Sequence, residues 1–205
     1  VYGNKFTKPV SENQKLKPTN PYAKSKKKVE DFLIKQNRLN YIILRYFNVA
    51  GSDFKLRTGQ ISKYRSTHLI KRLCEFALNQ KKLSIYGSDY PSKDGTAIRD
   101  YIHVEDLARA HILASKYVLK KKANLILNCG NGVGYTVLNI VKQFNKVSDK
   151  YVNYKFKSRG RGDVFKLVAK IDKIKKFLKF TPRYKNLDSI LKSHYDWEQK
   201  LKKNV

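Results

Sequence analysis

The chain has 205 residues and a formal net charge of +29, with 41% hydrophobic and 12% aromatic residues. This size and composition are typical of a globular chain with a sizeable core and exclude a disordered or fibrous protein. No apolar run approaches the length of a membrane span, and Cys74 and Cys129 have no CxxC spacing, so we expect a reduced, cytoplasmic protein with no membrane partner, no disulfide framework and no metal site.

The positive charge comes mainly from lysines scattered over the whole chain. Short lysine runs occur at 26–28, 120–122 and 175–176, in stretches that resemble helices or linkers. None stands beside a helix-turn-helix, zinc-finger or RNA-binding signature. We therefore predict a solvated lysine-rich surface and no nucleic-acid partner. Nucleic-acid binding stays open as an alternative, which a steep salt dependence of DNA binding would support.

The sequence contains no Met and opens with Val-Tyr-Gly, which resembles the end of a strand. A complete translation product normally begins with Met. We expect a fragment, or one half of an interrupted protein.

The first predicted helix follows a polar, proline-containing loop. Asn20 can cap it, with Pro21 at its first position. Val29, Phe32 and Leu33 then recur at helical spacing.

The stretch 41–51 is apolar and rich in β-formers, and it predicts one buried strand that ends at Gly51. Tyr46, Phe47 and Asn48 fall near its C-terminal end. In open α/β sheets, ligands bind at that end of the strands.

Helices and strands alternate through the rest of the chain, between polar loops at 52–66 and 88–100. We expect helices at 68–78, 105–121, 136–148, 170–180 and 187–201, and strands at 82–87, 101–104, 125–130 and 151–156. This alternation predicts an α/β fold.

Residues 130–135 read GNGVGY, between a predicted strand and a predicted helix. That setting suits a dinucleotide-binding turn. However, the spacing is incomplete and no acidic residue follows at the required distance. We predict that this turn binds no cofactor.

Tyr22 and Lys26 are four residues apart, which places them on one face of the predicted helix. A nearby ammonium favours the phenolate form of a tyrosine, which can then serve as an acid/base group. The spacing alone arises often by chance.

The surroundings of this pair make it more specific. An ordered set of motifs follows it: PYAKSK at 21–26, RYFN at 45–48, SIYGSDYPSKDGTAIRDYIHVEDLARAH at 84–111, NCGNGVGYTVLNIV at 128–141 and RGRGD at 159–163. This set resembles the UDP-glucose 4-epimerase family of extended short-chain dehydrogenases/reductases, from Val1 to about residue 200.

The resemblance implies an incomplete Rossmann-like parallel sheet with a C-terminal α/β substrate-binding subdomain. Residues 1–51 would be the remainder of the dinucleotide-binding domain. Residues 52–205 would be mainly the UDP-sugar-binding subdomain, with some segments returning to the main sheet.

The resemblance also implies bound NAD and interconversion of UDP-glucose and UDP-galactose, in a family whose members are commonly homodimers. Tyr22 would take the proton from the 4-hydroxyl of the sugar, and Lys26 would favour its phenolate and hold the nicotinamide ribose. Phe47 would line the nicotinamide.

The other implied site residues contact the nucleotide sugar. Asn48, His68 and Leu69 would approach the diphosphate and sugar, Ser84, Ile85 and Tyr86 would wall the uracil pocket, Arg99 and Arg161 would bind phosphate, and Asp163 would hold the uridine ribose.

The sequence departs from the family pattern in several places. The dinucleotide fingerprint and the catalytic Ser or Thr, which the family carries upstream of Tyr2 and Gly3, are not in this sequence. Gly160 falls where a phosphate-binding arginine is usual, so Arg161 or Arg159 would have to substitute.

Several residues also have purely structural interpretations. Tyr86 would then be a core residue, Arg99 and Asp100 an ordinary ion pair, and His103 a packed, hydrogen-bonded histidine. We interpret four more residues as packing or surface residues: Tyr135, His111, His194 and Trp197.

Two other functions stay open. One is another nucleotide-sugar epimerase or dehydratase. The other is an inactive remnant, or a non-catalytic half that needs an N-terminal partner.

Overall fold

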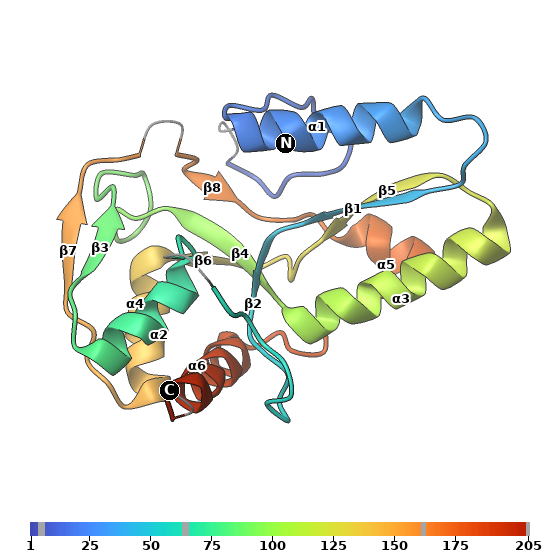
Figure 1. Cartoon of the computed structure of the whole chain (residues 1–205). Coiled ribbons are helices and arrows are strands. Elements are labelled where there is room, and N and C mark those ends of the chain that lie inside the picture. The colour runs from blue at the N-terminus through green and yellow to red at the C-terminus, as the bar shows by residue number, and fades with distance from the viewer. Residues whose placement is uncertain (4–6, 63–65, 161–162, 204–205) are drawn as a thin grey trace.

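Helices and strands alternate along the computed structural model, which describes residues 1–3, 7–62, 66–160 and 163–203 (Figure 1). The helices are α1 (Pro21–Ile34), α2 (Leu69–Asn79), α3 (Val104–Lys121), α4 (Val137–Ser148), α5 (Asp172–Leu178) and α6 (Leu187–Lys203). The strands are β1 (Ile42–Tyr46), β2 (Asn48–Ala50), β3 (Leu83–Tyr86), β4 (Ile98–His103), β5 (Leu125–Cys129), β6 (Gly134–Thr136), β7 (Tyr154–Lys157) and β8 (Lys166–Leu167).

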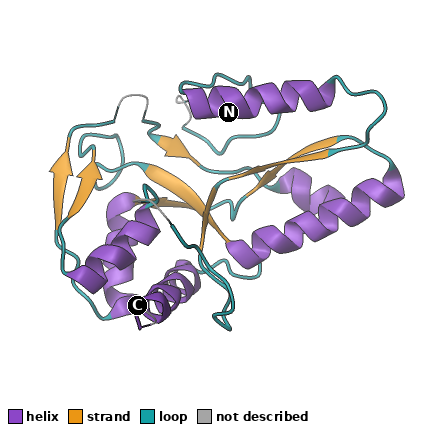
Figure 2. Cartoon of the chain, viewed as in Figure 1, coloured by secondary structure: helices purple, strands orange, loops and turns teal. Residues whose placement is uncertain are grey.

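Most strand pairs are parallel, which confirms the predicted α/β class. Strand β1 pairs with β5, β2 with β4, β3 with β7, and β8 with β4, all in parallel, whereas β6 runs antiparallel to β4. Figure 2 shows α1 on one side of β1 and β5, and α3 and α5 on the other. No helix in the described part of the chain is long and apolar enough to cross a membrane.

The prediction of one strand over 41–51 is wrong, because the chain changes partners at Phe47. The Phe47 N–H donates to the carbonyl of Cys129 at 3.1 Å, at the end of β5. Its side chain is buried against Tyr2, Val10 and Ala169. The next residues then pair with β4 as β2.

Two further boundaries differ from the sequence prediction. Strand β4 begins at Ile98, inside the predicted loop 88–100, and β7 begins three residues later than the predicted strand at 151–156. The short strands β6 and β8 were not predicted. The remaining predicted helices and strands match their positions to within a few residues, and Thr136 caps α4 as expected.

Two large apolar clusters build the core. One joins α2, α4 and α6 to β3, and the other joins α3 and α5 to β1, β4 and β5. The division at residue 51 into two parts of different function stays a prediction.

Asp100 links its own strand, β4, to the turn after β5 and to the segment after β8. Its buried carboxylate accepts the N–H groups of Asn131 and Gly132 at 2.9 Å and of Ala169 at 3.0 Å. The GNGVGY turn therefore has two of its N–H groups bonded to a carboxylate. It also leads into strand β6 before α4. Both features agree with the prediction that this turn binds no dinucleotide.

Helix α1 is held by an ion pair. As predicted, Asn20 caps it, accepting the N–H of Ala23 at 2.8 Å. Its only buried residue is Glu30, whose carboxylate lies 2.7 Å from Nη2 of Arg45 on β1. Val29 and Phe32, despite their helical spacing, are 56% and 62% exposed.

We expect Glu30→Gln to release α1 while the rest of the chain stays folded. Breaking a buried ion pair costs about 3–5 kcal/mol, and α1 buries no other side chain. Hydrogen exchange of the α1 amides should accelerate by at least about a hundredfold, with little change in β4.

Asp31→Asn is the matched control, because it removes only the more exposed pair of Lys27 with Asp31 on the same helix. Such pairs contribute less than about 1 kcal/mol. If the α1 amides exchange at equal rates in the two variants, the ion pair of Glu30 with Arg45 does not hold the helix.

Candidate active site

A cleft of about 720 Å³ opens between the start of α1, the ends of β1 and β2, the N-terminus of α2, and β3. The structure brings together at this cleft all the predicted site residues except Lys26 and Arg161. Those lining it are Tyr22, Phe47, Asn48, His68, Leu69, Ser84, Ile85, Tyr86, Arg99 and Asp163. Arg161 lies outside the described residues.

Tyr22 stands at the edge of the cleft on the first turn of α1 and is 68% exposed. The ammonium of Lys26 lies 5.4 Å from the centre of its ring. The two side chains thus share a face of the helix, as their spacing predicted. Both are exposed in this chain.

Arg99 brings positive charge to the cleft without a carboxylate partner. Its Nη1 donates to the carbonyls of Ile98 at 2.9 Å and Phe165 at 3.2 Å, and among the described residues no carboxylate lies within 4 Å of it. Burial lowers the pKa of Arg99 below its ordinary value. The alternative of an ion pair with Asp100 is therefore wrong.

The N-terminus of α2 contributes main-chain N–H groups. His68 is its N-cap, but no side chain caps the helix there and its first turn has no acidic residue. The first-turn residues Leu69, Ile70 and Lys71 all line the cleft. Uncapped N–H groups and the helix dipole favour an anion at such a position.

Strand β3 forms another wall. Ser84 is half-buried and Tyr86 is 53% exposed, so the interpretation of Tyr86 as a core residue is wrong. Ile85 is buried in the core cluster of α2 and α4.

Asp163 lies at the edge of the cleft and is hydrogen-bonded to Gly160. Its carboxylate accepts the N–H of Gly160 at 2.8 Å, and its own N–H donates to the Gly160 carbonyl at 3.1 Å. A Cβ at Gly160 would lie 2.8 Å from that carboxylate. This arrangement therefore favours glycine at position 160.

Sequence reasoning missed a buried cluster behind α2. Lys71 Nζ lies 2.6 Å from Oε1 of Glu198 on α6, and both side chains are almost fully buried. His194, on the same helix, accepts the N–H of Gly51 on Nδ1 at 3.2 Å. Its Nε2 has no hydrogen-bond partner among the described residues.

His194 is buried, in agreement with its interpretation as a packing residue, and it also lines the cleft with Lys71. His103 is packed and hydrogen-bonded as predicted. It lies 3.0 Å from Ser193 Oγ and accepts the N–H of Glu105.

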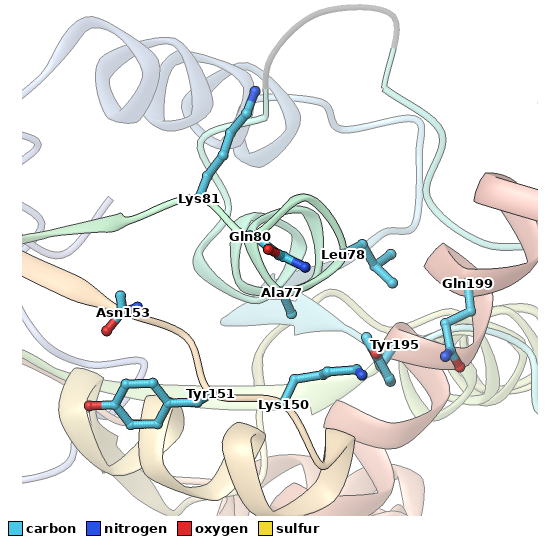
Figure 3. A pocket seen from close by; sticks show the side chains of 9 residues that line it. All are labelled: Ala77, Leu78, Gln80, Lys81, Lys150, Tyr151, Asn153, Tyr195 and Gln199. Atoms are coloured by element: carbon cyan, nitrogen blue, oxygen red, sulfur yellow. The ribbon is translucent and has the colours of Figure 1, made fainter.

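A second pocket, of about 620 Å³, lies at the C-terminal ends of α2 and α4 (Figure 3). None of the predicted site residues lines it. Its polar lining includes Gln80, Lys81, Lys150 and Gln199, and it faces helix ends that present carbonyl groups. Because the predicted site residues gather at the first cleft, we take that cleft as the candidate active site.

Residues 1–130 match the family model described as "NAD dependent epimerase/dehydratase family". The chain belongs to this family. Its fold is accordingly Rossmann-like, in agreement with the sequence prediction.

The matches to named relatives and to solved structures extend over the whole chain. It is 42% identical to a UDP-glucose 4-epimerase of Azospirillum brasilense, over 100% of this chain and 60% of that protein. A structure of UDP-glucose-4-epimerase from Stenotrophomonas maltophila with bound NAD and formylated UDP-arabinopyranose superposes with a TM-score of 0.96 at 28% identity, over 100% of this chain and 62% of that one.

A UDP-glucose 4-epimerase from Bifidobacterium longum in complex with NAD⁺ and UDP superposes with a TM-score of 0.91 at 29% identity, again over 100% and 62% of the two chains. The chain thus spans about 60% of the length of the curated relatives it matches.

His194 is expected to make stability depend on pH. Burial, together with the positive charge of Lys71, lowers its pKa to about 4. Below about pH 6.5 the unfolded chain therefore binds a proton at His194, whereas the folded chain binds it only near pH 4. Its contribution to stability is present above pH 6.5 and is lost as pH falls toward 4, by about 2–3 kcal/mol at pH 4.5.

Urea unfolding of the unaltered chain and of His194→Asn, at pH 7 and at pH 4.5, measures the contribution of His194 to the free energy of unfolding. Asp100, whose pKa burial raises to about 6, acts in the opposite direction in both proteins, so the difference between them isolates His194. His111→Asn, at an exposed histidine, should leave the pH dependence unchanged. A pH-independent difference for His194→Asn would contradict the assignment.

Proposed function

We propose that this chain carries the substrate site and the acid/base pair of a UDP-glucose 4-epimerase, which interconverts UDP-glucose and UDP-galactose with bound NAD. One observation carries the proposal: residues that the family resemblance selects from six separate parts of the sequence line a single cleft. The names of the relatives and the ligands of the solved structures support it.

In this proposal Tyr22 accepts the proton of the sugar 4-hydroxyl and later returns it. Lys26, 5.4 Å from the Tyr22 ring centre, supplies the positive charge that stabilises the phenolate. Bound NAD would accept the hydride from C4 of the sugar and return it to the opposite face, so there is no net redox change.

The chain's own residues fit the nicotinamide end of that cofactor. Phe47 is a buried aromatic residue that lines the cleft, as Tyr22 and Asn48 do. Lys26, exposed beside Tyr22, would donate to a ribose hydroxyl. The GNGVGY turn does not suit the dinucleotide pyrophosphate, because Asp100 already accepts the N–H groups of Asn131 and Gly132.

The substrate would lie with its diphosphate between Arg99 and the N-terminus of α2. The uracil would contact Ser84 and Tyr86 on β3, and Asp163 would accept a hydrogen bond from the uridine ribose. This arrangement leaves the sugar toward Asn48 and Tyr22.

The exposure of α1 favours a second possibility, a half that works only with an N-terminal partner. Tyr22 is 68% exposed, and Val29 and Phe32 on the same helix face solvent. General acid/base groups are most effective where water is excluded. An inactive remnant and a different UDP-sugar substrate are the remaining alternatives.

Calorimetric titration of the 205-residue chain with UDP and with NAD tests the proposal, alongside turnover of UDP-galactose. We expect UDP to bind and NAD to bind weakly or not at all. Turnover should appear when the part of the Azospirillum brasilense relative that this chain does not span is added as a separate chain.

Absence of UDP binding would contradict the proposed function. UDP binding without turnover, even with the added part, would favour the inactive remnant. Faster turnover of another UDP-sugar would identify a different enzyme of the family.

Tyr22→Phe should lower turnover in the reconstituted enzyme by about 10²–10⁴-fold with unchanged UDP affinity, because it removes only the proton-transfer group. Tyr151→Phe, at an exposed tyrosine that does not line the cleft, is the matched control. Equal rates for the two variants would exclude Tyr22 as the base.

A further inference from the structure

The diphosphate of a nucleotide sugar carries at least two negative charges, so a site for it is expected to hold more than one cation. Arg99 supplies one. The other basic residues near the proposed diphosphate position differ in whether a carboxylate already engages them, and this difference can be read from the structure.

Two of these residues are engaged. Arg159 lies 2.7 Å from the Asp89 carboxylate, and its guanidinium is 3.9 Å from the centre of the Tyr90 ring. Lys71 is paired with Glu198 on α6, through both carboxylate oxygens. Neither is free to receive a phosphate group without breaking an existing ion pair.

Arg72 is the exception. It lies one turn beyond the N-cap of α2, is half-buried and lines the cleft. Among the described residues its side chain makes no ion pair and no hydrogen bond. Its guanidinium carbon lies 4.6 Å from the centre of the Phe76 ring.

This stacking orients the guanidinium while leaving its N–H groups free. Phe76 is itself buried in the core cluster, so the ring is a fixed platform. An arginine held in this way loses little side-chain entropy when it binds an anion, and its planar fork suits phosphate oxygens.

A second observation points to a polar ligand at the same cleft. The neutral His194 ring accepts a hydrogen bond on Nδ1, so its proton is on Nε2. That N–H is buried and makes no hydrogen bond among the described residues. The Glu198 carboxylate, which is already bonded to Lys71, lies 3.9 Å from it, beyond hydrogen-bond distance. The uncapped N–H groups of α2 lie on the same wall.

We propose that Arg72 is the second diphosphate-binding cation of this cleft, acting with Arg99 and the N-terminus of α2. The inference rests on the proposed function, because it takes a nucleoside diphosphate as the ligand. It assigns Arg72 a substrate-binding role, with no part in proton transfer.

Calorimetric titrations with UDP and with uridine separate phosphate binding from base binding. Arg72→Gln should weaken UDP binding by about tenfold or more, the usual effect of losing a hydrogen bond to a charged group. Uridine affinity should change less than about twofold. Arg72→Lys, which keeps the charge but loses the fork, should fall between.

Arg38→Gln is the matched control, since it removes one positive charge from an exposed residue that does not line the cleft. It should leave UDP affinity nearly unchanged. Circular dichroism of each variant checks that it is folded. If Arg72→Gln does not fold, Arg72→Lys still tests the role of Arg72.

Three other outcomes would contradict the proposal, each for a different reason. Equal loss of UDP and uridine affinity in Arg72→Gln would mean that Arg72 only shapes the cleft. If Arg99→Gln weakens UDP binding and Arg72→Gln does not, the proposed function stands and Arg72 has no part in it. If neither ligand binds the unaltered chain, the proposed function fails, and this inference fails with it.

Discussion

The buried ion pair between Glu30 and Arg45 is the constraint on which the position of Tyr22 depends. Helix α1 fully buries only Glu30, and its apolar Leu33 is no more than half-buried, so apolar contacts contribute little to its position against β1. Arg45 donates to both carboxylate oxygens of Glu30 and also to the Tyr2 hydroxyl and the Glu12 carbonyl. This network ties the start of the chain, α1 and β1 together, and so sets where the acid/base pair stands relative to the cleft.

The distribution of charge in the cleft follows from which carboxylates are already used. Asp100 is taken up by main-chain N–H groups and Glu198 by Lys71. Arg99 and Arg72 are left with no carboxylate partner among the described residues. A cleft with two unpaired guanidinium groups and an uncapped helix N-terminus is suited to an anion. The net charge of +29 thus includes two unpaired arginines at the cleft, which composition alone could not locate.

The sequence predicted the alternation of elements, the caps at Asn20 and Thr136, and the shared face of Tyr22 and Lys26. These depend on local rules of spacing and hydrogen bonding. Apolar content alone could not reveal the break at Phe47, because the run from 41 to 51 stays apolar on both sides of the change of partner.

Long-range features escaped prediction for a related reason. Lys71 and Glu198 are far apart in the sequence, and each sits in a helix where a charged residue normally faces solvent. Nothing local distinguishes them. Arg72 also looks like an ordinary surface residue until Phe76 and the cleft are placed beside it. Helical spacing alone also did not decide burial on α1, since Val29 and Phe32 are exposed whereas Leu33 is half-buried.

A crystal structure of the chain with bound UDP tests the central claim most directly. We expect the diphosphate within hydrogen-bond distance of Arg99, Arg72 and the first-turn N–H groups of α2, with the uracil against Ser84 and Tyr86. UDP bound at the second pocket beside Lys150, or with its diphosphate away from Arg99, would contradict it.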